Sequence, residues 1–167
     1  VKDSAAVFSK AIVRANKLES DHWLSQANMD KAPKDAKGSF KNAMAALDPY
    51  VKAGRFKTFD GDVEVLPGIR ALGGHGHTPG HTAFVVESGG RKMMVIGDLI
   101  HVAAVQMENP AVTIQFDGDQ KAAAATRKKE FDAAAKGGYM IGGAHLQFPG
   151  LGHLRTESKG YRFVPGK

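Results

Sequence analysis

Histidine and aspartate side chains that can bind a metal ion gather at three points of the sequence. The first is the glycine- and histidine-rich run 74–81, which contains His77 and His81. The second is Asp98, which follows the apolar segment 93–96, and the third is His145, which follows segment 139–143. Imidazole and carboxylate groups bind Zn²⁺ in sites without cysteine. If both apolar segments are strands, their ends can bring these side chains together on one or two divalent cations.

The composition excludes several other kinds of chemistry. The chain has 167 residues and no cysteine, so disulfides, thiolate metal sites and cysteine nucleophiles are excluded. A hydrophobic fraction of 43% with 24% charged residues is typical of a globular chain, and we expect one domain over residues 1–167.

Charge and hydropathy argue against two classes of partner. The net charge is +6, but lysines and arginines are spread along the chain rather than gathered in a basic stripe, which argues against nucleic-acid binding. No apolar run reaches the roughly 18 residues that a membrane span needs, so we expect no membrane insertion.

Hydrophobic periodicity and turn residues predict the helices and strands that must position these histidines and the aspartate. A strand over 11–15 leads into a helix that Asn16 caps and that runs to about Gln26. Residues 30–38 are expected to form a loop. The spacing of apolar residues then predicts a helix around 40–47, within a segment that ends at Gly54.

The second part of the chain alternates strands with one long helix. We expect short strands near 63–65 and 69–72, and a hairpin of 82–87 with 92–96 across the two glycines at 89 and 90. An alanine-rich helix over 119–136 and strands at 139–143 and 160–164 follow. Mixed elements of this kind indicate a layered α/β fold.

Each of the three points also has a purely structural interpretation. The histidine-rich run can be a tight solvated loop, Asp98 a turn or cap residue, and His145 a structural histidine. Their common position after predicted strands, together with their spacing, favours the ligand interpretation over these alternatives.

The same residues carry a family resemblance. The run His77-Thr-Pro-Gly-His81, followed by Gly97-Asp98 and His145, resembles the C-terminal half of a metallo-β-lactamase-fold hydrolase. Further segments resemble methyl parathion hydrolases and related lactone or aryl-ester hydrolases: 23–26, 30–33, 49–54, 102–106, 148–150 and 159–165. The resemblance implies an αββα sandwich, of which this chain would be the C-terminal half and therefore one incomplete domain.

The resemblance also implies a role for each ligand candidate. His77 matches a ligand of the first metal, Asp98 the carboxylate that bridges both metals and takes part in catalysis, and His145 a ligand of the second metal. His81 matches a histidine that supports the ligands without binding metal. The implied cofactor is a pair of divalent cations, most readily zinc, and the implied nucleophile is the hydroxide that bridges them.

The implied substrates are small esters, lactones or phosphotriesters. Trp23 and Phe40 match aromatic residues of the substrate pocket, although both are equally compatible with an ordinary apolar core. His101 departs from the methyl parathion hydrolases, which carry an apolar residue there. An imidazole can donate or accept a hydrogen bond, so we expect a lactone or aryl ester to be preferred over a phosphotriester.

One ligand motif of the family, His-x-His-x-Asp-His, does not occur in this sequence. We therefore expect this chain to be the C-terminal half of the enzyme, to need an N-terminal ligand segment, and to be almost inactive alone. By analogy, the resemblance also suggests a homodimer and a bacterial periplasmic location. The alternatives are a glyoxalase-like thioesterase, an acyl-homoserine lactonase, or a non-catalytic half-domain that binds a partner.

Overall fold

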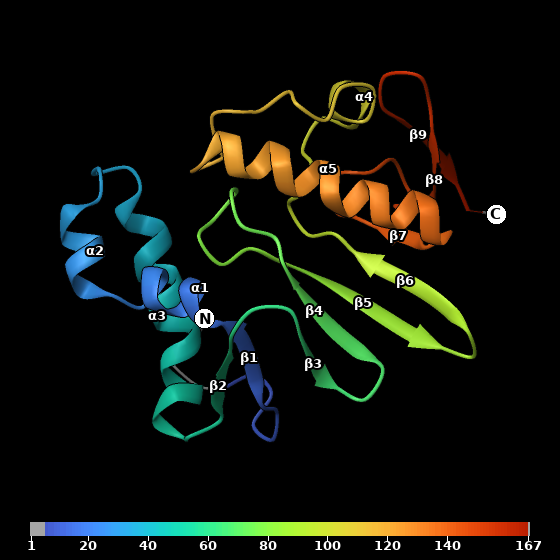
Figure 1. The fold of residues 1–167 in the computed structure, drawn as a ribbon. Helices are drawn as coiled ribbons and strands as arrows, with labels where there is room; N and C mark the ends of the chain where they lie inside the picture. The colour runs from blue at the N-terminus through green and yellow to red at the C-terminus, as the bar shows by residue number, and fades with distance from the viewer. Residues whose placement is uncertain (1–5, 167) are drawn as a thin grey trace. The chain divides into compact units, whose positions relative to one another are not determined.

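The protein is described by a computed structural model of residues 6–166, in which the chain forms two compact units. One unit extends to Asp60 and the other begins at Gly61 (Figure 1). The single domain expected over 1–167 stays a prediction. In the described part of the chain, none of the helices has the length and apolar character of a membrane span.

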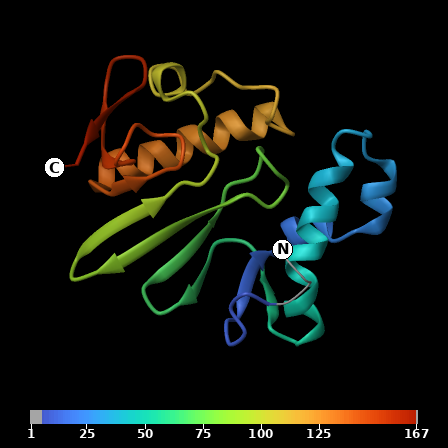
Figure 2. The ribbon, with the colours of Figure 1, turned by 180° about the vertical axis from the view of Figure 1, so that it is seen from behind.

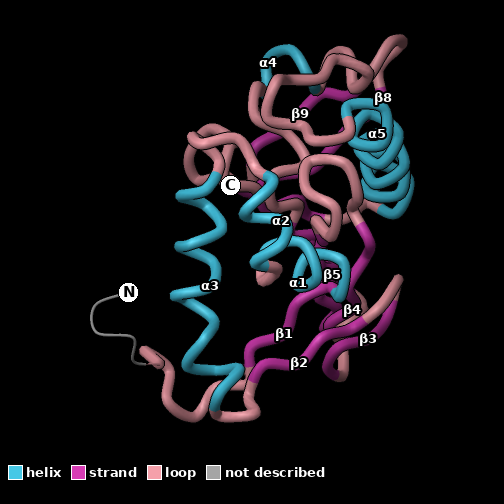
Figure 3. Tube along the Cα trace, turned by 90° about the vertical axis from the view of Figure 1, so that its left-hand side faces the viewer, coloured by secondary structure: helices cyan, strands magenta, loops and turns pink. Residues whose placement is uncertain are grey.

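The first unit pairs two short strands that three helices connect. Its elements are β1 (Val13–Asn16), α1 (Lys17–Trp23), α2 (Gln26–Lys31), α3 (Lys37–Lys52) and β2 (Phe56–Phe59). β1 and β2 are parallel, and α3 packs against β2 (Figure 3). Parallel strands need a long crossover, and here the helices provide it.

Local capping explains where the first helices begin. The Asn16 side chain accepts the Leu18 N–H at 2.9 Å, as the predicted N-cap requires. The predicted extent of this helix is wrong, because α1 ends at Trp23. The Ser25 hydroxyl then accepts the Asn28 N–H at 3.2 Å and starts a second helix, which extends into the expected loop.

The second unit is built on a seven-stranded sheet. Its strands are β3 (Val63–Leu66), β4 (Ile69–Gly73), β5 (Thr82–Ser88), β6 (Arg91–Val95), β7 (Met140–Gly142), β8 (Leu151–Thr156) and β9 (Tyr161–Pro165). They lie side by side in sequence order, and the antiparallel run from β3 to β6 is visible in Figure 2. β6 and β7 are parallel, whereas every other neighbouring pair of this sheet is antiparallel.

Helix α5 (Gln120–Gly137) covers one face of this sheet and forms the crossover from β6 to β7, together with the short α4 (Ala103–Gln106). Phe131 and Ala134 of α5 are fully buried against Met94, Ile96 and Ile141 of the sheet strands and their ends. Close packing in this apolar layer holds the ends of the strands in place, and with them the loops that follow.

Most predicted elements of this unit are confirmed. The hairpin turns at Gly89 and Gly90, both with positive φ, and α5 ends on Gly138 in the left-handed conformation. Strand β8 of this unit, like β2 of the first unit, was not predicted. Gly152 interrupts the apolar pattern of β8, and a Cβ there would lie 2.3 Å from the Val164 carbonyl oxygen of β9.

Candidate metal centre

The direction of the strands brings the three histidine- and aspartate-bearing loops to one edge of the sheet. β5 is antiparallel to both β4 and β6, and β7 is parallel to β6, so β4, β6 and β7 run in the same direction. His77 lies in the loop after β4, Asp98 after β6, and His145 after β7. The three side chains therefore converge, although His77 and His145 are separated by well over half of the unit in sequence.

Asp98 lies between the two histidines, with one carboxylate oxygen toward each. Its Oδ2 is 3.4 Å from Nε2 of His77, and its Oδ1 is 3.3 Å from Nε2 of His145. Charge-assisted hydrogen bonds are shorter, about 2.7–2.9 Å. One carboxylate that offers each oxygen to a different imidazole has the arrangement of a ligand shared by two cations.

The two separations suit a tetrahedral cation. Zinc binds histidine nitrogen and carboxylate oxygen at about 2.0–2.2 Å with tetrahedral angles, which places neighbouring ligand atoms about 3.4 Å apart. The N···O separations of 3.4 and 3.3 Å agree with this value. His77, Asp98 and His145 therefore have donor types and spacings that suit a divalent cation, and a second cation that shares Asp98 stays a prediction.

His81 holds the backbone next to Asp98. Its Nε2 accepts the Asp98 backbone N–H at 3.0 Å, so its Nδ1 carries the proton and donates to the Gly74 carbonyl at 3.1 Å. Both ring nitrogens are thus bonded to the backbone. Gly97 permits this approach, because it has a φ of +53° and a Cβ would lie 2.8 Å from His81 Nε2.

The loop that carries His77 is held against the start of α5. The His77 carbonyl accepts the Gly118 N–H at 3.1 Å, and the Gly76 carbonyl accepts the Asp119 N–H at 2.8 Å. At Gly76 a Cβ would lie 2.1 Å from the Ala123 nitrogen, so only glycine allows this contact. The long helix therefore supports the candidate site as well as the core.

A buried carboxylate orients the His77 ring. Asp117 has a fully buried side chain, and its Oδ1 lies 3.4 Å from His77 Nδ1, on the ring edge opposite Asp98. Asp117 Oδ2 faces the buried Arg127 guanidinium at 3.4 Å and accepts the Ile114 N–H at 3.3 Å. A carboxylate behind a ligand histidine fixes the tautomer and the ring orientation.

Arg127 completes this network from the middle of α5. Its guanidinium donates to the carbonyls of Leu99, Pro110 and Val112 at 2.7–2.8 Å, which ties the loops after β6 to the helix. Burial lowers the pKa of Arg127, and Asp117 opposes this shift.

Neither Asp117 nor Arg127 was predicted as a functional residue from the sequence. A signal existed for the arginine, because Arg127 lies on the same helical stripe as the buried residues Ala123, Phe131 and Ala134. An arginine on a buried stripe needs partners for its charge. Asp117 carried no such signal, because it lies in an irregular loop.

His101 lies within the candidate centre. Its ring centroid is 4.8 Å from that of His77 and 4.6 Å from that of His145. One ligand atom from each of His77, Asp98 and His101 can be chosen so that all lie within 4.8 Å of one another. Burial, reinforced by the two neighbouring histidines, lowers the pKa of His101.

The Gln106 side chain holds the backbone beside this histidine. Its oxygen accepts the N–H groups of His101 and Val102 at 2.8 and 3.0 Å. Nδ1 of His101 is buried, and no described residue forms a hydrogen bond with it. The substrate-contacting role suggested for His101 stays a prediction.

The two aromatic residues suggested for the substrate pocket pack together in the first unit. The rings of Trp23 and Phe40 are 4.7 Å apart, and Phe40 is 3% exposed. Trp23 Nε1 donates to Glu19 at 2.9 Å. These contacts give both residues a place in the packing of that unit, and a contact with substrate stays a prediction.

Comparison with known proteins identifies the family. The sequence model of the metallo-beta-lactamase superfamily matches residues 9–145. A search of curated proteins gave no match. The chain belongs to the metallo-β-lactamase superfamily, and its predicted fold is confirmed.

Solved structures agree with this assignment. The hydrolase AbOPH of the beta lactamase superfamily has a TM-score of 0.87 and 33% identity, covering 96% of this chain and 56% of that one. AidC, a dizinc quorum-quenching lactonase, has a TM-score of 0.86 and 25% identity, covering 99% of this chain and 58% of that one. A probable metal-dependent hydrolase from Staphylococcus aureus has a TM-score of 0.62 and 20% identity, covering 83% and 46%. The chain thus spans little more than half the length of the first two.

Proposed function

We propose that this chain supplies one side of a dinuclear metal centre in a hydrolase that opens lactones or cleaves aryl esters. The observation that carries the proposal is Asp98, whose two carboxylate oxygens face two different imidazoles at 3.4 and 3.3 Å. In such a centre His77 would hold the first cation, His145 the second, and Asp98 would contribute to both.

Two divalent cations there would lower the pKa of a bound water and polarise the carbonyl or phosphoryl oxygen of a substrate. The residues of this chain supply the positioning. Asp117 orients His77, and His81 holds the backbone at Asp98. Zinc suits the nitrogen and oxygen donors present, and AidC is a dizinc enzyme.

Three ligand residues do not complete two tetrahedral sites. We propose that the further ligands come from a His-x-His-x-Asp-His segment, a motif that this sequence does not contain. When two parts of a protein each supply ligands, bound metal strengthens the association of the two parts. Association of the parts in turn strengthens metal binding. The chain alone should accordingly bind zinc weakly.

The proposed substrate class depends on His101 and on the relatives. His101 offers an imidazole beside the proposed metal ligands, where the methyl parathion hydrolases that the sequence resembles are expected to have an apolar side chain. A polar group suits the ester oxygens and developing charge of an opening lactone. AidC is a lactonase of similar fold, and this supports an acyl-homoserine lactone as a specific second candidate beside aryl esters.

The test is hydrolysis by the intact protein before and after removal of metal. We expect turnover of an aryl lactone and of a chromogenic aryl ester, with a slower phosphotriester reaction. Treatment with a chelator should abolish all three, and added Zn²⁺ should restore them in parallel. Turnover that survives complete metal removal would contradict the proposal.

A further inference from the structure

The loop between β7 and β8 carries an almost fully exposed aromatic side chain. Phe148 follows the proposed ligand His145 by three residues, and it is 93% exposed, more than any other large apolar side chain in the described part of the chain. Single exposed apolar residues are common on protein surfaces, whereas a group of them marks a contact surface. The surroundings of Phe148 therefore decide what its exposure means.

This loop is held at its ends and in its middle. The Gly143 N–H donates to the Gly150 carbonyl at 3.1 Å, which closes the loop where β7 and β8 pair. Leu146 is buried and belongs to the apolar core, and His145 faces the candidate centre from the same loop. Backbone bonds and core contacts therefore hold the segment that presents Phe148 to solvent.

The loop after β6 presents further apolar side chains in the same region. Val102 directly follows His101 and is 47% exposed, and Val105 of α4 is 45% exposed. The ring centroids of His101 and His145 are 4.6 Å apart, so the two loops meet beside the candidate centre. We call Phe148, Val102 and Val105 the apolar rim.

The apolar rim borders the side of the candidate centre that this chain leaves open. The His145 side chain is 39% exposed, whereas His77 is largely buried and has Asp117 behind it. In protein interfaces, apolar contacts exclude water from the polar groups that they surround. An apolar rim beside an exposed ligand therefore suits a partner surface that covers both.

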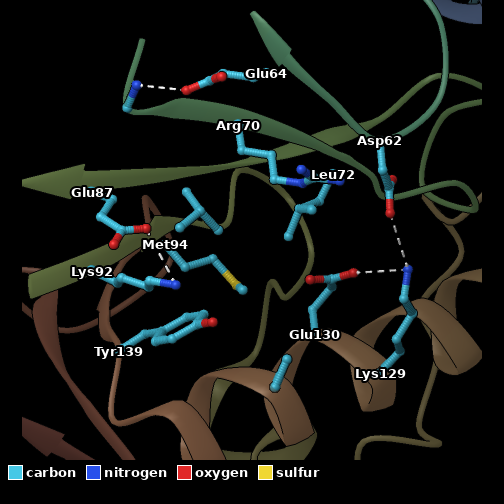
Figure 4. Close-up of a pocket in the computed structure, with 13 residues that line it drawn as sticks. Asp62, Glu64, Arg70, Leu72, Glu87, Lys92, Met94, Lys129, Glu130 and Tyr139 are labelled. Carbon is cyan, nitrogen blue, oxygen red and sulfur yellow. Dashed lines mark hydrogen bonds and ion pairs between the residues drawn. The ribbon is translucent and has the colours of Figure 1, made fainter. Parts of the chain in front are cut away.

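The cavity between the sheet and α5 does not show this need for a partner (Figure 4). Its volume is about 440 Å³, and several charged side chains on its walls pair with one another. Lys92 lies 3.2 Å from Glu87, and Lys129 lies 3.5 Å from Glu130. None of the candidate metal ligands lines this cavity. Of these two features, the apolar rim is the one that borders the candidate centre.

We propose that the apolar rim is the docking surface for the part of the intact protein that supplies the remaining metal ligands, with Phe148 as its largest contact. This rests on the proposed function, in which three ligand residues do not complete two sites. The chain spans 56% of AbOPH and 58% of AidC, so these relatives have additional chain that could form such a part. The partner surface is apolar where it meets Phe148 and brings its ligands beside His145.

The absence of cysteine from this chain provides a direct test of accessibility. The intact protein, with its ligand-supplying part, is treated with iodoacetamide in the presence of a chelator, and alkylation at each site is followed by mass spectrometry. We expect Phe148→Cys to react about a hundredfold or more slowly than Leu66→Cys, because a covered thiol reacts through transient opening. Unfolding in urea should make the two rates equal.

Leu66 is the matched control because it is 50% exposed and ends β3 just before β4 begins, at the opposite end of β4 from the His77 loop. Val102→Cys is the second rim variant, and it should also be protected. The proposal is overturned if the Phe148→Cys and Val102→Cys thiols of the folded protein react as fast as that of Leu66→Cys.

Zinc affinity tests the link between docking and the metal centre. In the intact protein, Phe148→Ser should weaken zinc binding about tenfold, whereas Phe148→Leu keeps an apolar contact and should stay within about threefold. If wild type and Asp98→Ala bind equally little zinc while the thiol at position 148 stays protected, the metal proposal fails and the docking surface stands. If zinc binding depends on Asp98 but the thiol is freely reactive, the docking surface fails alone.

Discussion

The two histidines on either side of Asp98 are held very differently. The His77 side chain is 16% exposed and has the buried Asp117 behind it, whereas the His145 side chain is 39% exposed. Among the described residues, the polar contact of His145 is with Asp98, and its ring also packs beside His101. One side of the candidate centre is therefore organised within this chain, and the other is left more open.

This difference indicates how the centre would be assembled. A ligand held in orientation by a buried network loses little entropy when metal binds, whereas a more exposed ligand must be ordered by the metal itself. We therefore expect the His77 side to contribute to folding stability and the His145 side mainly to metal binding.

Replacing each histidine separately gives the largest expected effects. His77→Ala and His145→Ala should each lower kcat/KM by about a thousandfold or more, since each removes a proposed metal ligand. His77→Ala should also lower the unfolding free energy of the metal-free protein, because Asp117 loses a buried partner. Steady-state kinetics and urea unfolding of the metal-free variants measure the two effects. Equal losses of stability in His77→Ala and His145→Ala would contradict the proposed difference between the two sides of the centre.

Asp117→Asn tests the network behind His77. It should weaken metal binding about 10- to 100-fold, because the histidine loses its orienting carboxylate. It should also lower the unfolding free energy by about 3 kcal/mol, since Arg127 loses a buried charged partner. Metal competition titrations and denaturant unfolding provide the measurements.

Asp48→Asn is the matched control. It removes a carboxylate from an exposed ion pair with Lys52 on α3, and should change either quantity little. Unchanged metal affinity in Asp117→Asn would show that the buried carboxylate does not orient a ligand.

His101→Leu tests substrate preference, because the His101 ring lies beside the rings of both His77 and His145. It should lower the kcat/KM ratio of lactone to phosphotriester about tenfold, because the polar imidazole is replaced by an apolar side chain. His153→Leu replaces an exposed histidine of β8 and should leave the ratio unchanged. The same ratio in wild type and His101→Leu would exclude His101 from specificity.

The smallest expected effect is on the pH dependence of stability, and it follows from a comparison of two buried carboxyl groups, Asp117 and Glu130. Asp117 faces an arginine, whereas burial raises the pKa of Glu130. The folded state then keeps the Glu130 proton at pH values where the unfolded chain has lost it, so stability falls as pH rises through that range. Glu130→Gln removes this dependence.

Relative to wild type, Glu130→Gln should therefore gain stability as the pH rises above the ordinary range of a glutamate, by about 1.4 kcal/mol for each unit by which the pKa is raised. Urea unfolding at several pH values measures the difference. A constant difference across these pH values would show that Glu130 titrates normally.

The sequence predicted much of this arrangement because its signals are local. The glycine pair at 89 and 90, the Gly138 cap of α5 and the apolar segments before Asp98 and His145 each specify nearby backbone. The strand directions that follow from them bring the loops to one edge. Asp117 was missed because its role arises from contacts with His77 and Arg127, which are distant in sequence.

The most direct test of the account is the metal content of the intact protein and of its Asp98→Ala variant, measured by elemental analysis after gel filtration. We predict about two zinc ions per polypeptide in a wild-type protein that includes the proposed His-x-His-x-Asp-His segment, and fewer than one in its Asp98→Ala variant, because the shared ligand is lost from both sites. Two tightly bound ions retained in Asp98→Ala, or none in catalytically active wild type, would contradict the account.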